Sequence, residues 1–357
     1  ATLGLLAPIA ATANEVTIND FNPAEELAIT NSRVDGLEAR LNNFEAGSFS
    51  ETTTASFSVD GYLGSTDDDD GVDDDAVGAG YSFQIDLNTS FTGEDSLDVS
   101  LDAGNGGTEG IAEFDGNGNG DGLEVDGVSY TFPIGEKVTA IIGDNTDGSA
   151  LFTTACVYGG PGNMLDDCAN VNAGITGGAT TVGASYDVGG GVTAAFGAQT
   201  DNTSVFTDES LDAYALNVAY TADVYGLSLT YGVVENAALT EENKYTALNA
   251  YYTPEGSLPS ISVGYEFGDL GGEAAGADET SSFMVGLSWD EIGPGSFGVG
   301  AGHSNTVENA DELYQYEAYY AYPVNDGMTI TGLIGTRDAA GDVDDTTMIG
   351  VKTSFSF

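Results

Sequence analysis

Residues 213–220 read AYALNVAY, so a large apolar or aromatic side chain stands at every second position, with Ala or Asn between. The same alternation recurs at 227–233 (LSLTYGV) and at 261–267 (ISVGYEF). Because successive side chains of a β-strand point to opposite faces, each stretch predicts a strand with one apolar face and one small or polar face. A soluble β-sandwich also alternates in this way, and it is the main alternative fold.

The number of such stretches and their connections favour a membrane barrel. From Ser50 onward the chain reads as strands and turns, and each strand is near the roughly 9–11 residues that a tilted membrane-spanning strand needs. Short turns alternate with long loops, as in outer-membrane barrels. We predict an all-β transmembrane antiparallel β-barrel of about 16 strands. The expected strands cover about 51–63, 79–91, 95–103, 123–133, 136–144, 178–187, 191–200, 211–222, 225–235, 243–253, 257–268, 279–290, 295–304, 311–323, 326–336 and 346–357.

The composition agrees with strands and turns. The 357 residues include 51 Gly, 18 Tyr and 16 Phe but only 8 Pro. There is no apolar run long enough for a transmembrane helix, and barrel strands give a much weaker hydropathy signal than such a helix.

The charge is strongly acidic, with 58 Asp plus Glu against 6 Lys plus Arg and a formal net charge of −52. A nucleic-acid partner is therefore not expected, because phosphate binding needs a basic surface. Two explanations stay open. One is that the acidic surface is an adaptation to saline water, where screening weakens the repulsion between like charges. The other is that the acidic side chains produce a field that concentrates cations at a channel.

Cys156 and Cys168 are the two cysteines of the chain and lie in one Gly-rich segment. No His and no second Cys pair accompany them, which argues against zinc. We predict a loop-closing disulfide, and hence an oxidising compartment such as a periplasm or cell surface.

Two segments precede the predicted barrel at 48–357. Residues 1–13 (ATLGLLAPIAATA) read as the remains of a secretory signal peptide. Residues 14–47 are expected to hold a periplasmic helix that begins with Asn22 as N-cap and Pro23 as first helical residue. We predict that this helix packs against the same helix of other subunits as a trimeric coiled coil. The residues of the predicted seam are Leu27, Val34, Leu37, Leu41 and Phe44. The alternative is an amphipathic helix that lies on its own barrel.

The chain resembles the cyanobacterial outer-membrane porins known as iron-uptake or S-layer-homology porins. Residues 32–41 (SRVDGLEARL) are similar to their coiled-coil segment, residues 49–54 (FSETTT) to the start of their first strand, and residues 128–139 to a strand–turn–strand segment. The resemblance covers about 22–357, apart from the long loops. The S-layer-homology module of that family has no counterpart in residues 14–21, so cell-wall anchoring through it is not expected. The terminal strand, with Phe355 and Phe357, also resembles the signal that the outer-membrane assembly machinery recognises.

Inward-facing positions of the barrel would carry the chemistry of a pore. If the apolar side chains face lipid, the inward set is mainly acidic, and carboxylates attract cations at close range. The alternative is that these charges only keep the wall wet. The residues expected to line the lumen are Asp86, Asp98, Asp102, Glu266, Glu317 and Lys352.

The segment 145–177 is expected to be the third outside loop. The resemblance implies that this loop folds inward and narrows the channel, and a disulfide within it would restrict its freedom. The alternative is a loop folded outward. The candidate constriction residues in or beside it are Asp144, Asp147, Asp166 and Asp167.

One further segment has the spacing of an EF-hand calcium loop, although no flanking helices are expected. A solvated turn is the alternative to Ca²⁺ binding. The acidic run from Asp67 to Asp75 could also collect divalent ions that bridge lipopolysaccharide. The candidate calcium ligands are Asp115, Asn117, Asn119, Asp121 and Asp126.

No catalytic motif is found. The single His303 lies near a strand end with no cysteine close in sequence, and neither a GxSxG motif nor a phosphate-binding loop is present. We therefore predict a non-enzymatic outer-membrane porin, without a required cofactor, that lets ions and small hydrophilic solutes diffuse, with cation preference. Its expected partners are the lipid bilayer, lipopolysaccharide, two further copies in a homotrimer and the assembly machinery. The alternative is a structural or adhesive barrel with acidic ion-binding loops and little conductance.

Overall fold

The computed structural model describes residues 52–67, 76–107, 111–114, 116–163, 165, 167–201, 205, 207, 211–235, 242–272, 277–341 and 344–357. The predicted signal-peptide remnant and the predicted coiled-coil helix lie outside these residues. No helix among the described residues is long and apolar enough to cross a membrane.

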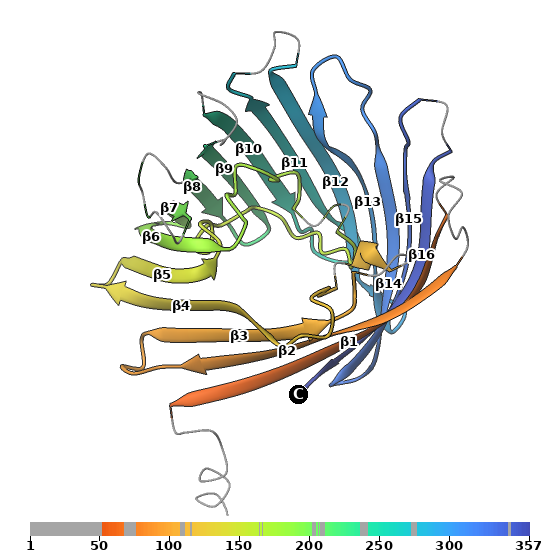
Figure 1. Ribbon diagram of the computed structural model, residues 1–357, viewed down its shortest axis with the longest axis horizontal. Coiled ribbons are helices and arrows are strands. Elements are labelled where there is room, and N and C mark those ends of the chain that lie inside the picture. The colour runs from red at the N-terminus through yellow and green to blue at the C-terminus, as the bar shows by residue number, and fades with distance from the viewer. Residues whose placement is uncertain are drawn as a thin grey trace, which may run out of the picture. The chain divides into compact units, whose positions relative to one another are not determined.

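Thr52–Phe357 forms a closed antiparallel barrel (Figure 1). Each strand pairs with its neighbours in sequence, and β1 pairs with β16 to close the ring. The strands are β1 (Thr53–Asp67), β2 (Val77–Thr89), β3 (Ser96–Gly104), β4 (Glu124–Ile134), β5 (Val138–Thr146), β6 (Ala179–Gly189), β7 (Val192–Thr200), β8 (Asp212–Thr221), β9 (Tyr225–Val234), β10 (Asn243–Tyr252), β11 (Ser260–Asp269), β12 (Glu279–Ile292), β13 (Gly295–Val307), β14 (Gln315–Asn325), β15 (Met328–Arg337) and β16 (Thr346–Ser356).

The predicted barrel and its sixteen strands are confirmed, and so is the alternation of short turns with long loops. The ends of some strands differ from the prediction. For example, β1 continues four residues past the predicted 63, to Asp67. Residues 64–67 carry no apolar alternation, and pairing with β16 as far as Asp67–Thr347 holds them in the sheet. Cross-strand pairing thus extends the strand where its own sequence gives no signal.

The apolar half of the alternation faces outward. On β8, β9 and β11 the side chains of Leu216, Leu229 and Val263 are 55%, 45% and 40% exposed, whereas Asn217 and Ser262 on the other face are 1% exposed. A band of exposed Leu, Val, Tyr and Phe around a barrel matches the lipid-facing belt of membrane barrels.

The interior is not empty, because two long loops fold into it. We call residues 105–123, between β3 and β4, loop L2, and residues 147–178, between β5 and β6, loop L3. Figure 1 shows the yellow-green segment between β5 and β6 passing inside the ring of strands. L2 contains the 3-10 helix η2 (Ala112–Phe114). Apolar side chains of both loops join side chains of the inner wall in one core: Tyr62, Ile111, Phe114, Tyr158, Leu165, Cys168, Ala169, Met284, Tyr319, Leu333 and Met348.

Candidate pore and constriction

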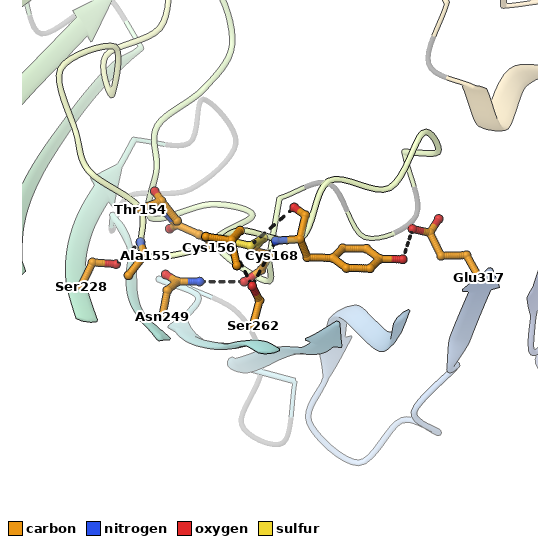
Figure 2. Close-up of a disulfide and its surroundings, with 11 residues drawn as sticks. Thr154, Ala155, Cys156, Cys168, Ser228, Asn249, Ser262 and Glu317 are labelled. Carbon is orange, nitrogen blue, oxygen red and sulfur yellow. Dashed lines mark hydrogen bonds between the residues drawn. A yellow bond between two sulfur atoms is a disulfide. The ribbon is translucent and has the colours of Figure 1, made fainter. Parts of the chain in front are cut away.

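L3 lies along the inner wall in an extended conformation. Its main-chain N–H groups at every second position, residues 153, 155 and 157, donate hydrogen bonds of 2.9–3.1 Å to polar side chains of β8, β9 and β11. This spacing matches the two-residue period of an extended chain. The wall side chains that accept these bonds are Asn217, Ser228 and Ser262. Figure 2 shows Ala155 of the loop beside Ser228, with Ser262 further along the wall.

Small residues on the inner wall leave room for L3. A Cβ at Gly264 would lie 1.8 Å from the carbonyl oxygen of Cys168, and one at Gly286 would lie 2.4 Å from the ring of Tyr158. Both distances are far below van der Waals contact. The small half of the alternating pattern therefore provides the surface on which L3 packs.

The predicted disulfide is confirmed: Cys156 and Cys168 are bonded, with their Cα atoms 6.4 Å apart. It joins the stretch of L3 that runs along β9 to β11 to the stretch that returns. The amide of Asn249 on β10 donates a 2.7 Å hydrogen bond to the carbonyl of Cys168, so the bridge is also fixed to the wall (Figure 2).

Glu266 and Glu317 face inward, but L3 covers them. Glu266 is 1% exposed and accepts hydrogen bonds from the main-chain N–H groups of Asn172 (2.9 Å) and Ala173 (2.7 Å). Glu317 is 4% exposed and accepts a 2.6 Å hydrogen bond from the hydroxyl of Tyr158. The expectation that they line the open pore is therefore corrected. Their carboxylates hold the loop, because a charged acceptor makes stronger hydrogen bonds than a neutral one.

L2 is a second inward loop, which the sequence reasoning missed. Ile111 and Phe114 are 0% and 1% exposed, and the ring of Phe114 lies 5.6 Å from that of Tyr62. The N–H of Asn163 in L3 donates a 3.0 Å hydrogen bond to the carbonyl of Glu113 in L2, so the two loops are connected. Two large apolar residues within a polar Gly-Asp-Asn segment were the available signal.

Carboxylates on β2 and β3 face the part of the interior that these loops leave. Asp86 accepts 2.8 Å hydrogen bonds from Gln84 and Ser100, and Asp98 accepts one of 2.7 Å from Ser96. Asp102 lies two residues from Ser100 on the same face, opposite Gln84. The structure thus places the three predicted aspartates of this wall on its inner side.

Two further aspartates extend this acidic wall. Asp98, Asp126 and Asp147 line one cavity of about 440 Å³. Asp126 lies two residues from Glu124, which pairs with Asp102 across β3 and β4. Asp147 additionally accepts a 2.9 Å hydrogen bond from the N–H of Gly177, which ties the two ends of L3 together. We call Asp86, Asp98, Asp102, Asp126 and Asp147 the acidic wall.

The other predicted constriction residues have different placements. Asp144 pairs directly with Val128, whose side chain faces outward, so the prediction that Asp144 belongs to the constriction is wrong. The register of the β4–β5 pair determines which face of the barrel Asp144 takes, and the alternation of residue types along the chain does not determine it. Asp166 lies outside the described residues. Asp167 lines a cavity with Arg337 at the long-loop end of the barrel.

The predicted calcium loop bonds to the barrel wall through three of its described members, and the fourth, Asp126, lies within β4. Asn119 accepts a 2.8 Å hydrogen bond from the N–H of Gly104, and Asp121 accepts one of 2.9 Å from the hydroxyl of Tyr81. The N–H of Asn117 donates to Ser82 on β2. Asp115 lies outside the described residues. Within the described part of the chain, no three His, Cys, Asp or Glu side chains form a group suited to a metal ion, and calcium binding stays a prediction.

Lys352 faces inward on β16, as predicted, beside Asp60 and Tyr62 of β1. At the end of the barrel, Phe357 exchanges main-chain hydrogen bonds with Phe57, and their rings stack 5.8 Å apart. Phe355 pairs with Val59 and is 39% exposed. The terminal residues therefore help to close the ring, and their role as an assembly signal stays a prediction.

Comparisons with known proteins agree on the architecture. No family model matches the chain. An uncharacterized protein of Nostoc sp. is 27% identical over 412 aligned residues, covering 93% of this chain and 70% of that protein. Among solved structures, Pseudomonas putida OprB at high pH has a TM-score of 0.63 at 12% identity and covers 86% of this chain and 94% of its own. An anion-selective porin from Comamonas acidovorans has a TM-score of 0.62 at 17% identity, with 86% and 99% covered. An Rh. blastica porin variant has a TM-score of 0.58 at 14% identity, with 85% and 100% covered. The chain therefore has the fold of a porin barrel.

Proposed function

We propose that this chain is an outer-membrane porin that lets ions and small hydrophilic solutes diffuse passively, with a preference for cations. The observation that carries this proposal is the acidic wall, which faces the space left between β2–β5 and the inward loops. A lipid-facing belt outside and a polar, charged surface inside are what a water-filled barrel requires. No bond is made or broken, so no nucleophile or general base is needed.

The sign of the preference follows from the charges. Each carboxylate of the acidic wall attracts cations and repels anions over a range of about 8–10 Å at physiological ionic strength. One of the similar porin structures is described as anion-selective. The fold alone therefore does not set the sign of selectivity, and the side chains of the inner wall must.

Planar-bilayer recording tests the proposal. Purified protein should form stable conductance steps, and in a KCl gradient the reversal potential should have the sign of cation permeation. The same preparation after thermal unfolding is the control. An anion-permeable channel would contradict the role given to the acidic wall, and the absence of any conductance would contradict the porin itself.

A structural or adhesive barrel is the second candidate, and one observation favours it. L2 and L3 meet inside the barrel and bury Ile111 and Phe114 almost completely, which fills much of the interior. Such a barrel would have the same fold and almost no conductance. Its acidic outside loops would then bind ions or partners.

The setting that we propose for the barrel follows from its surface and its terminal strand. The apolar belt supports a place in the outer membrane, with lipopolysaccharide around the long-loop end. The terminal strand, with Phe355 and Phe357, supports recognition by the outer-membrane assembly machinery. We further propose a homotrimer, held by the coiled-coil segment within residues 14–47.

A further inference from the structure

Few basic residues accompany the carboxylates of this barrel. The described residues include Lys137, Lys244, Arg337 and Lys352. Lys137 lies at the short turn before β5, and Lys244 pairs with Val233 on the outward face. Arg337 pairs with Gln315 and Lys352 with Tyr62, both on the inward face. Within the described part of the chain, the interior therefore holds two positive side chains.

Lys352 lies directly beside a carboxylate. Its Nζ is 3.1 Å from Oδ2 of Asp60 and 5.7 Å from the ring centroid of Tyr62. The side chains of Lys352 and Asp60 are 23% and 24% exposed, so both still meet the water of the lumen. A cation over an aromatic face is attracted to it, which helps to keep the ammonium next to Asp60.

Arg337 is paired in the same way. Its Nη2 contacts Oε1 of Glu113, which lies in η2 of L2. Arg337 is 43% exposed and Glu113 is 12% exposed at the side chain. L2 thus places a carboxylate against this basic side chain of the wall.

The two ion pairs lie at different heights along the barrel. Lys352 pairs with Thr331 on β15, and Arg337 lies six residues further toward the long-loop end of that strand. At about 3.3 Å per residue, the two positions are roughly 20 Å apart along the strand. A solute crossing the barrel would pass both of them.

We propose that Asp60 and Glu113 are specificity-determining residues, each acting by neutralising the basic side chain beside it. This inference rests on the proposed function as a cation-preferring channel. With both pairs intact, no uncompensated positive charge of the described residues faces the lumen, and the acidic wall alone sets the local field. Loss of Asp60 would leave the Lys352 ammonium unpaired in the lumen, where it repels cations and attracts anions.

The position of a carboxylate affects the selectivity of the channel more than the total number of carboxylates does. Charges further away than about 8–10 Å are largely screened at physiological salt, so the many exposed carboxylates of the loops do not replace Asp60. Asp326, at the exposed turn between β14 and β15, provides a matched control for the loss of one carboxylate outside the lumen.

The test compares the reversal potentials of Asp60→Asn and Asp326→Asn in a KCl gradient, with gel mobility before and after heating as the check of folding. We expect Asp60→Asn to lower the ratio of cation to anion permeability by about fivefold. Asp326→Asn should leave the ratio unchanged. Lys352→Met should raise it, because Asp60 is then unpaired, and Asp60→Asn combined with Lys352→Met should return it to the wild-type value.

The outcomes separate this inference from the proposed function. A wild-type barrel that conducts no ions overturns the proposed function, and this inference with it. If the wild type conducts with cation preference but Asp60→Asn behaves like Asp326→Asn, the inference alone is overturned. It is also overturned if the double variant keeps the shift of Asp60→Asn, or if Lys352→Met leaves the ratio unchanged. The Lys352→Met result decides the matter even where Asp60→Asn does not fold.

Discussion

Gly264 shows how closely single residues of the wall are matched to the loop that covers them. The carbonyl oxygen of Cys168 occupies the space that a side chain at this position would need, 1.8 Å from the position of a Cβ. Two residues further along β11, Glu266 accepts two N–H groups of the same loop. At this scale the wall both admits L3 and holds it, and one added methyl group should disturb the fit.

Replacing Gly264 by Ala tests that fit. Overpacking of this kind costs about 1–3 kcal/mol, and the cost should fall on L3, because the strand itself accepts Ala readily. We expect an altered single-channel conductance and faster proteolysis within L3. Gly61→Ala is the control, because a Cβ at Gly61 meets no atom within 4 Å. Equal behaviour of the two variants would show that the loop does not depend on this contact.

At the scale of elements, the turn between β2 and β3 is held by one carboxylate. Oδ1 of Asp95 accepts hydrogen bonds from the N–H groups of Phe91 (2.9 Å) and Thr92 (2.8 Å), while Oδ2 accepts one of 2.6 Å from the hydroxyl of Tyr130. The hydrogen bond from Tyr130 is the main cause that lowers the pKa of Asp95, and bonds from Thr92 and Ser90 add to it. The turn thus depends on the ionised form of this side chain.

Stability of this turn should therefore depend on pH. Because the pKa of Asp95 is lower in the folded state than its ordinary value of about 4, its stabilising effect is present above pH 4 and is lost as the pH falls further. Asp95→Asn should unfold more easily than the wild type at pH 7. The difference should shrink progressively in acid, as measured by heat-dependent gel mobility in detergent. A difference that is constant from pH 7 to pH 2 would contradict this account.

L3 is an element of another kind, since it is fixed by side chains of many strands and by its own disulfide. Removing the bridge with Cys156→Ser and Cys168→Ser should leave the barrel folded, because no strand pairing involves these residues. A bridge closing a loop of this size is worth about 3 kcal/mol. We expect larger current fluctuations in single-channel records. Reductant should produce the same change in the wild type and none in the variant. Unchanged records in both would contradict the proposal that the disulfide restricts the motion of L3.

At the scale of the whole molecule, the inward loops cover some carboxylates of the interior and leave others facing the remaining space. Glu266 and Glu317 are covered and bind L3, whereas the acidic wall faces the remaining space. The net charge of −52 therefore does not produce a uniform electrostatic field inside the barrel. What a permeating ion meets depends on which carboxylates the loops leave uncovered and which basic residues are neutralised.

Assembly into trimers is a prediction at the same scale. Three helices joined along Leu27, Val34 and Leu41 would hold three barrels together, because an isolated helix of this length is marginal in water. Native mass measurement in detergent should give trimers for the full chain and monomers after removal of residues 14–46. Trimers that survive the truncation would show that contacts between the barrels are sufficient.

The sequence by itself determined the strand count, the apolar and polar faces of the strands and the alternation of loop lengths. It did so because the two-residue period of a strand appears directly as an alternation of apolar and polar residues. It also marked Cys156 and Cys168 as partners, since no other cysteines compete. Only the tertiary structure decided that Asp144 points outward, that L2 folds inward and that Glu266 and Glu317 lie beneath L3. Those outcomes depend on strand register and on contacts such as Tyr158 to Glu317, between residues 159 positions apart, which no local pattern encodes.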